Sequence, residues 1–226
     1  MVFLNTILDS ILDLLFETKC IFCGKTGADL CMECLSDAPN AERESAKWIF
    51  PLYDYRSPII KKSLWMLKYS GKKRLAKVFA EVIYDKMIEE LSELTILENF
   101  YNIILIPIPL SPKRYRERGY NQAQLICEEL IKINNLRKIL DFKLENNILI
   151  KPKETEHQAR IKDRNIRLKN IIGSFAIKNT SSIEIIKNKN IILIDDIATT
   201  GATLTEARKI LKQTGARKII AFTVAH

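Results

Sequence analysis

One segment near the C-terminus restricts the fold more than any other part of the chain. The run from Asn190 to Asp195 contains four consecutive aliphatic residues and leads into two adjacent carboxylates, Asp195 and Asp196. A turn rich in Thr and Gly follows, and then an amphipathic stretch over 202–213. A short continuous aliphatic run is typical of a parallel strand that is covered on both faces. We therefore predict a strand over 190–195, two acids just after its carboxyl end, a turn and a helix.

Strand-like and helix-like segments alternate along the rest of the chain. We expect strands at 47–55, 102–108, 172–177 and 218–224, with another near 147–150, and helices at 1–17, 57–69, 72–91 and 120–133. Residues 109–118 and 151–170 are expected to form loops, the second with a short helix as the alternative. Pro51 places the first strand at a sheet edge, because proline cannot donate to a sheet ladder. This alternation predicts an α/β fold with a parallel sheet.

Composition and charge narrow the class of protein and of ligand. The chain has 226 residues, 47% hydrophobic and 28% charged, which is typical of a globular protein. The net charge of +9 favours anionic partners. The apolar N-terminal segment lacks the basic start and cleavage site of a signal peptide, so we expect a cytoplasmic protein with an amphipathic helix there. That helix packs on its own domain or, alternatively, docks on a partner or a membrane.

Between Arg56 and Lys77 the chain carries eight Lys or Arg residues and no acid, with Trp65 and Tyr69 among them. Cations interleaved with aromatics suit single-stranded nucleic acid, through phosphate contacts and base stacking. The alternative is a solvated helix face whose aromatic side chains point inward. The nucleic-acid candidates are Lys61, Lys62, Lys68, Lys72, Lys73 and Arg74.

Four of the five cysteines form two C-x-x-C pairs, Cys20 with Cys23 and Cys31 with Cys34. Four thiolates at this spacing are typical of a closed structural zinc site, which contributes on the order of 10–16 kcal/mol to folding. An iron–sulfur cluster or two disulfides are alternatives, and the disulfides are disfavoured because no export signal is evident. The fifth cysteine, Cys127, lies in a helical pattern and is expected to be buried. A polar stretch over 35–47 then separates a zinc-knuckle region, 1–47, from a larger domain, 48–226.

Glycine is scarce, with seven in the chain, so each is expected where the backbone demands it. Gly201 lies in the turn after the acids, among three threonines. Backbone N–H groups at such a helix start suit a phosphate monoester, and two nearby carboxylates suit vicinal hydroxyls. Together they describe ribose 5-phosphate. The glycine motifs of P-loop and dinucleotide-binding proteins are both absent.

The segment Ile191–Leu204 resembles the phosphoribosyl-pyrophosphate (PRPP) signature of type I phosphoribosyltransferases. Further segments, in the same order, narrow the resemblance to the ComF-like competence proteins (ComF/GntX family), which join a four-cysteine, double zinc ribbon-like region to a phosphoribosyltransferase domain. These segments are Leu67-Lys68-Tyr69 with Gly71 (L-K-Y-x-G), Ile106–Leu110 with Arg118–Gln122 (P-V-P-L…R-G-F-N-Q), Thr155-x-x-Gln158 (T-x-x-Q), and Arg167-x-x-Asn170-Ile171 with Gly173–Phe175 (R-x-x-N-V…G-A-F). The match extends over nearly the whole chain.

This resemblance implies a role for each segment. Asp195 and Asp196, the candidate catalytic residues, would hold the ribose hydroxyls, and Mg²⁺ would arrive with the pyrophosphate and need no dedicated protein cage. The segment over 151–170 would form a lid over the site. The 5′-phosphate loop would consist of Ala198, Thr199, Thr200, Gly201, Ala202 and Thr203. The pyrophosphate candidates, with solvated loop cations as the alternative, are Lys113, Arg114, Arg116, Arg118, Arg164 and Arg167.

The resemblance further implies a PRPP-binding protein that acts in DNA uptake during natural transformation, handling single-stranded DNA together with other competence proteins. Two alternatives remain. The chain could be an active phosphoribosyltransferase, a glycosyltransferase that moves ribose 5-phosphate to a base or amine with release of pyrophosphate. It could also be a PRPP sensor or adaptor without turnover. No base-selective set of residues is evident from the sequence.

Overall fold

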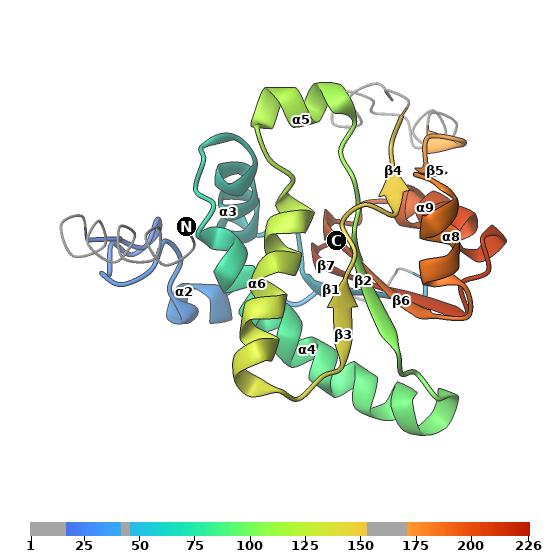
Figure 1. Cartoon of the computed structure of the whole chain (residues 1–226). Coiled ribbons are helices and arrows are strands. Elements are labelled where there is room, and N and C mark those ends of the chain that lie inside the picture. The colour runs from blue at the N-terminus through green and yellow to red at the C-terminus, as the bar shows by residue number, and fades with distance from the viewer. Residues whose placement is uncertain (1–16, 42–45, 153–170) are drawn as a thin grey trace.

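A computed structural model describes residues 17–41, 46–152 and 171–226 (Figure 1). The strands are β1 (Ile49–Tyr53), β2 (Ile103–Pro107), β3 (Phe142–Leu144), β4 (Leu149–Ile150), β5 (Ala176–Ile177), β6 (Asn190–Ile197) and β7 (Lys218–Ala225). The helices are α2 (Met32–Ser36), α3 (Pro58–Tyr69), α4 (Leu75–Glu98), α5 (Pro112–Arg118), α6 (Gln122–Arg137), α8 (Thr180–Ile186) and α9 (Ala202–Gln213).

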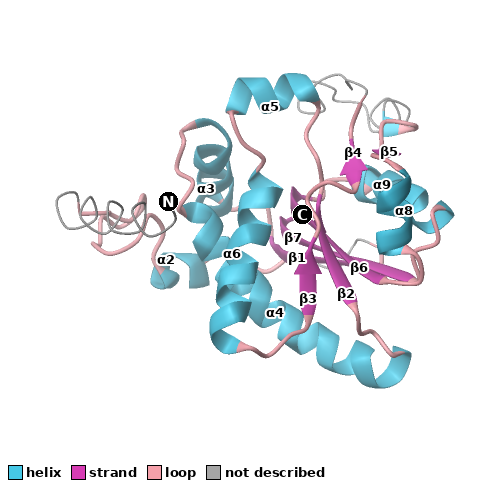
Figure 2. Cartoon of the chain, in the orientation of Figure 1, coloured by secondary structure: helices cyan, strands magenta, loops and turns pink. Residues whose placement is uncertain are grey.

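Five strands form one parallel sheet in the order β1-β7-β6-β2-β3. Helices α4 and α6 cover one face, and α8 and α9 lie on the other (Figure 2). On β6, Ile192 and Ile194 pack in the core beneath α4 and α6, whereas Ile191 and Leu193 pack in the core beneath α9. Both faces of β6 are therefore buried, which explains its unbroken aliphatic run. The expected α/β fold with a parallel sheet is confirmed.

Strand β1 lies at the edge of the sheet and pairs with β7 alone among the main-sheet strands, as Pro51 predicted. On its open side the chain preceding it adds a short antiparallel contact, because the Ala41 N–H donates to the Leu52 carbonyl at 3.0 Å. The polar segment after α2 is thus tied to the edge of the sheet.

The acids do not follow β6, as the sequence suggested, but lie within it. Asp195 pairs with Thr223 and Ile197 with Ala225, because β7 runs alongside β6 as far as Ala225, the last residue of β7. The strand alternation therefore still applies at the acids. It places Asp196 on the face of Ile192 and Ile194 and Asp195 on the opposite face.

The segment after β2 is also different from the expected loop, since α5 spans most of it. Ser111 caps this helix by accepting from the Arg114 N–H, Pro112 occupies its first turn, and Gly119 ends it at φ 75°. These are ordinary start and stop signals for a helix, at 111, 112 and 119. Helix α5 lies over the carboxyl ends of the strands (Figure 1).

Other elements also differ from the sequence expectation. The strand expected at 172–177 is reduced to β5, which pairs with β4 in a separate antiparallel sheet. Helix α4 extends to Glu98, where Asn99 ends it in the left-handed conformation. Helix α8 was not expected, although Asn179 caps it by accepting from the Ser182 N–H.

All seven glycines adopt positive φ angles, as their scarcity predicted. A side chain at Gly201 is disfavoured for two reasons. The φ angle is 68°, and an added Cβ would lie 3.2 Å from the Ile49 Cδ1 atom, which is a tight contact. This glycine fixes the turn between β6 and α9.

Two expectations lie outside the described residues. They are the N-terminal helix, apart from its last residue, and the segment over 153–170, which includes Arg164 and Arg167. Within the described ranges, no helix combines the length and the apolarity that a membrane crossing requires.

Candidate functional site

A cavity of about 450 Å³ opens at the carboxyl edge of the parallel sheet. Its walls come from the ends of β1, β2 and β6, from α3 and α5, and from the starts of α6 and α9. The lining residues are Tyr55, Leu64, Trp65, Lys68, Tyr69, Ile108, Pro109, Leu110, Ser111, Arg114, Arg118, Asn121, Gln122, Lys151, Asp195, Asp196, Ile197, Thr199 and Thr203. This is the edge at which open α/β sheets bind ligands.

The two acids of the cavity differ in charge because they face different neighbours. Burial raises the pKa of Asp195 well above its usual range, and the adjacent Asp196 carboxylate raises it further. Burial also opposes ionisation of Asp196, but the ammonium of Lys68 lowers its pKa below the usual value. Lys68, from α3, forms an ion pair with Asp196. Asp195 therefore holds its proton more strongly than Asp196, and the two carboxyls can exchange hydrogen bonds with hydroxyls.

The turn after β6 has the features of an anion-binding loop. Thr199 and Thr203 line the cavity, and the left-handed Gly201 starts α9. The neighbouring residues set the shape of the turn, because the Ala198 N–H donates to Ala225 and the Ala202 N–H donates to Thr200 Oγ1. In the described chain, the N–H groups of Thr199, Thr200 and Gly201 make no hydrogen bond. Free N–H groups beside a helix start favour an anion.

Helix α5 sends only part of its charge into the cavity. Arg114 and Arg118, one turn apart, line it, whereas Lys113 and Arg116 do not. Arg118 is held in place, because its guanidinium donates to Gln122 Oε1 at 2.8 Å and to the Tyr69 hydroxyl at 3.1 Å. Helical periodicity separates these two pairs of cations, whereas a loop would not have distinguished them.

Lys151 is a cavity residue that sequence reasoning missed. It follows β4, and its Nζ lies 5.1 Å from the centre of the Phe175 ring. Burial lowers the pKa of Lys151 to about 8, and the neighbouring Arg114 guanidinium lowers it further. Lys151 forms no ion pair within the described residues, although the Asp195 carboxyl acts to raise its pKa. A lysine that lies close to an arginine is a further anion-binding group. Its position just after a two-residue strand gave no signal in the sequence.

Asn121 and Gln122 form the base of the cavity at the start of α6. Asn121 caps that helix by accepting from the Ala123 N–H, and it donates to the Ile108 carbonyl at 2.9 Å. This buried side chain therefore joins the end of β2 to the first turn of α6. Gln122 is only 2% exposed, and its Nε2 atom has no hydrogen-bond partner within the described residues.

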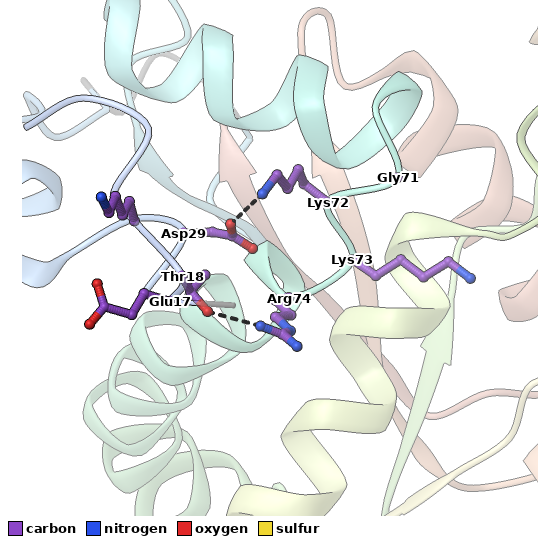
Figure 3. A pocket seen from close by; sticks show the side chains of 8 residues that line it. Glu17, Thr18, Asp29, Gly71, Lys72, Lys73 and Arg74 are labelled. Atoms are coloured by element: carbon purple, nitrogen blue, oxygen red, sulfur yellow. Dashed lines mark hydrogen bonds and ion pairs between the residues drawn. The ribbon is translucent and has the colours of Figure 1, made fainter. Parts of the chain in front are cut away.

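Three of the nucleic-acid candidates instead contact residues 17–38, which we call the cysteine region, and hold it against α3 and α4. Lys62 donates to the Ile21 carbonyl at 2.9 Å, Lys72 pairs with the buried Asp29 at 2.9 Å, and Arg74 donates to Thr18 Oγ1 at 2.9 Å. Figure 3 shows the last two contacts across a second cavity of about 540 Å³. Lys73 points away from this cavity, with its Nζ 4.8 Å from the centre of the Tyr120 ring. Lys61 and Lys73 are exposed.

The two aromatic side chains of the basic run point outward. Trp65 is 57% exposed and Tyr69 51% exposed, so the alternative in which they pack in the core is wrong. Both line the cavity at the carboxyl edge of the sheet.

The four expected metal ligands come together within the cysteine region. The Sγ atoms of Cys20, Cys23, Cys31 and Cys34 all lie within 4.8 Å of one another, and those of Cys23 and Cys31 are 3.6 Å apart. Four thiolates around one ion at about 2.3 Å would be about 3.8 Å apart, so the cluster can hold a metal ion. Cys127 is fully buried in α6, as expected.

The electrostatics of the cysteine cluster also fit a cation. Burial opposes ionisation of Cys20, yet backbone N–H groups of Cys23, Cys31 and Phe22 lower its pKa to about 6. Hydrogen bonding from the neighbouring thiols, Cys23 first, raises the pKa of Cys34 to about 12. One thiolate therefore forms readily, and a full set needs a positive ion at the centre.

The chain is similar to several known proteins. A family model described as a phosphoribosyl transferase domain matches residues 148–226. The chain is 29% identical to competence protein F of Haemophilus influenzae, over 88% of this chain and 81% of the relative. It is 29% identical to competence protein ComFC of Streptococcus pneumoniae, over 96% and 84%. It is 25% identical to the DNA utilization protein YhgH of Escherichia coli O6:H1, over 90% and 82%.

The position of Lys151 predicts how anion binding depends on pH. Its positive charge is present below a pKa of about 8 and is lost as the pH rises through that value. At pH 9 about one-tenth of such a side chain is protonated, so affinity for PRPP should fall by up to about tenfold between pH 7 and pH 9. Lys151→Arg should remove most of this decline, because arginine stays charged. Calorimetric titration at each pH measures both, and an equal decline in the arginine variant would contradict the assignment.

Proposed function

We propose that this chain, which belongs to the ComF-like proteins, binds PRPP at the carboxyl edge of its sheet and takes part in handling single-stranded DNA in the cytoplasm. The observation that carries the proposal is the cavity itself. It places two carboxyls, an anion-binding turn and, in addition to Lys68, three cations around one space. A sugar with vicinal hydroxyls, a 5′-phosphate and a pyrophosphate offers a partner to each.

Each group has a distinct task in this proposal. Asp195 and Asp196 bind the ribose hydroxyls, and the turn over 198–203 receives the 5′-phosphate. Arg114, Arg118 and Lys151 face the pyrophosphate. Mg²⁺ bound with the pyrophosphate would supply further positive charge, and carboxylates and phosphate oxygens are its usual ligands.

Changing the acids tests PRPP binding directly. Asp195→Asn and Asp196→Asn each keep the shape of the side chain but replace the carboxyl group with an amide. We expect each to weaken binding of PRPP with Mg²⁺ by about 10- to 100-fold, because each loses an oxygen that bonds a ribose hydroxyl, and Asp196→Asn also loses a charge-assisted hydrogen bond. Asp141→Asn, at an exposed position outside the cavity, is the matched control. Wild-type affinity in both acid variants, measured by calorimetry, would rule out the proposed ribose contacts.

The same titrations separate the two alternatives. Release of pyrophosphate in the presence of a base or an amine would identify an active phosphoribosyltransferase. Binding of PRPP without pyrophosphate release would favour a sensor or adaptor that acts in DNA handling.

The DNA-handling part of the proposal draws support from the relatives, whose names describe competence and DNA utilization. The chain also offers surface charge for it. Lys61 and Lys73 are exposed and belong to the run without acids, whereas Lys62, Lys72 and Arg74 contact the cysteine region. Of these candidates, Lys61 and Lys73 are therefore the cations best placed to bind phosphates.

The salt dependence of DNA binding tests these two lysines. For a single-stranded oligonucleotide, each phosphate contact contributes about 0.7 to the slope of log affinity against log salt. The double variant Lys61→Ala/Lys73→Ala should therefore reduce that slope by about 1.4. The control Lys143→Ala/Lys209→Ala removes the same charge from other exposed positions. An equal loss in the control, seen by fluorescence anisotropy, would show that only net charge matters.

We propose zinc as the ion of the cysteine cluster. Four thiolates at tetrahedral spacing, with backbone N–H groups directed at sulfur, suit zinc more than a hard cation. Four ligands from the protein would close the coordination shell, so the ion has a structural role. Reduced thiols held by a metal are also the usual state of such pairs in the cytoplasm.

Metal analysis of the purified protein tests this proposal. We expect about one zinc per chain, and a loss of bound zinc in Cys23→Ser. Cys127→Ala, a buried cysteine outside the cluster, should keep its zinc. After chelation, residues 17–38 should become sensitive to proteases, because this short region has little apolar core of its own. Iron in place of zinc, or a metal-free protein that resists proteolysis equally, would contradict the proposal.

A further inference from the structure

The exposed face of α3 carries a line of side chains that the cavity alone does not explain. Lys61, Trp65 and Tyr69 occur at intervals of four residues, so they lie on one side of the helix. All three are exposed, and the exposed Lys73 follows after the turn that ends the helix. We call Lys61, Trp65, Tyr69 and Lys73 the α3 track.

The two aromatic rings of the track form a platform. Their centroids are 5.9 Å apart and their planes are inclined by 46°. The Arg118 guanidinium lies 4.9 Å from the centre of the Tyr69 ring and donates to its hydroxyl. Arg118 is in turn bound to Gln122. Arg118 and Gln122 of the cavity therefore hold Tyr69 in position, although the two rings remain more than half exposed.

A platform of this kind selects its ligand by chemistry. Large aromatic side chains that stay in water have apolar faces available for stacking. Cations flank the rings along the track, and Arg118 lies at the platform edge. A planar heteroaromatic ring on an anionic backbone satisfies both features, whereas an apolar protein segment satisfies only the first.

The exposure of the two rings distinguishes between a polymeric ligand and a small free base. Trp65 and Tyr69 stand at the mouth of the cavity and are 57% and 51% exposed. A subsite for a free base is expected to enclose its ligand on most sides. An open platform continued by a cation in each direction instead suits a strand that enters and leaves.

The geometry points to the α3 track as a binding surface for single-stranded nucleic acid, with one or two bases stacked on Trp65 and Tyr69 at the mouth of the PRPP cavity. Arg118 then borders both ligands. The nucleic acid and PRPP are thereby coupled, because both are anions that approach the same cation. This inference rests on the proposed PRPP site for the coupling, but the stacking itself stands apart from it.

Buried groups in the cavity are consistent with a ligand that reaches inward. The Gln122 amide, which holds Arg118 through its oxygen, leaves its nitrogen without an acceptor in the described chain. A buried amide N–H without a partner is unfavourable. An acceptor atom on a base edge or on a sugar placed there would satisfy it.

Tryptophan fluorescence provides the test, since the chain has two tryptophans. Trp48 packs under Arg208, 4.6 Å from its ring, and does not line the cavity. In the variant Trp48→Phe, Trp65 is therefore the sole reporter. We expect a dT12 oligonucleotide to quench it with a saturable curve, and the complex to be weakened by PRPP with Mg²⁺. Equilibrium linkage requires the oligonucleotide to weaken PRPP binding by the same factor.

Substitutions on the platform give the second arm. Trp65→Leu and Tyr69→Leu should each weaken dT12 binding by roughly tenfold, since a stacked base contributes on that order. Calorimetry without DNA measures the PRPP affinity of the same variants, and their loss of dT12 binding should exceed any loss of PRPP affinity. Tyr101→Leu is the control, because Tyr101 is 53% exposed but precedes β2 at the opposite edge of the sheet.

Each outcome decides the inference separately from the proposed function. Quenching by dT12 without PRPP binding would keep the track and reject the PRPP site. PRPP binding with no quenching by dT12, or with quenching by free adenine alone, would reject the track and keep the PRPP site. Equal losses of DNA binding in Tyr101→Leu and in the platform variants would reject base stacking. A coupling factor of one, or mutual strengthening, would contradict the shared approach to Arg118 and overturn the stated position.

Discussion

The burial of two carboxyl groups at the end of a strand is the constraint on which the rest of this structure depends. Asp195 and Asp196 continue β6, whose preceding residues are covered on both faces. Neither carboxylate is stable there without compensation, because burial penalises its charge. The chain compensates one of them through Lys68, which α3 brings in from a different part of the sequence. The other is left with a raised pKa. The position of α3 is therefore tied to the chemistry of the sheet edge.

The sequence predicted the parts of the fold that local patterns determine. Both faces of β6 and β7 are buried, so their residues read as continuous apolar runs. The edge position of β1 followed from Pro51, and the turns followed from glycine. The cysteine cluster followed from spacing alone, since two thiols in each C-x-x-C pair are brought together by the turn between them. In each case the signal lies in a short stretch of the sequence.

What the sequence did not predict depends on contacts between distant segments. The length of β6 is set by β7, whose pairing carries the strand past the acids. Lys68 looked like one more surface cation, and only the packing of α3 turns it toward Asp196. Lys62, Lys72 and Arg74 differ from Lys61 in their partners, not in their local sequence. Helix α5 is the exception: Ser111, Pro112 and Gly119 give a local signal there, but the charged sequence between them resembles a loop.

Helix α3 links the two sites because its sides have different partners. Leu64 and Leu67 pack into the core, Lys68 reaches Asp196, and Lys62 holds the carbonyl of Ile21 beside the cysteine cluster. The turn after α3 adds Lys72 on Asp29 and Arg74 on Thr18 (Figure 3). A shift of the cysteine region would therefore act on the same helix that neutralises Asp196. An ion in that cluster, although structural, would help to set the charge of the cavity through the position of one lysine.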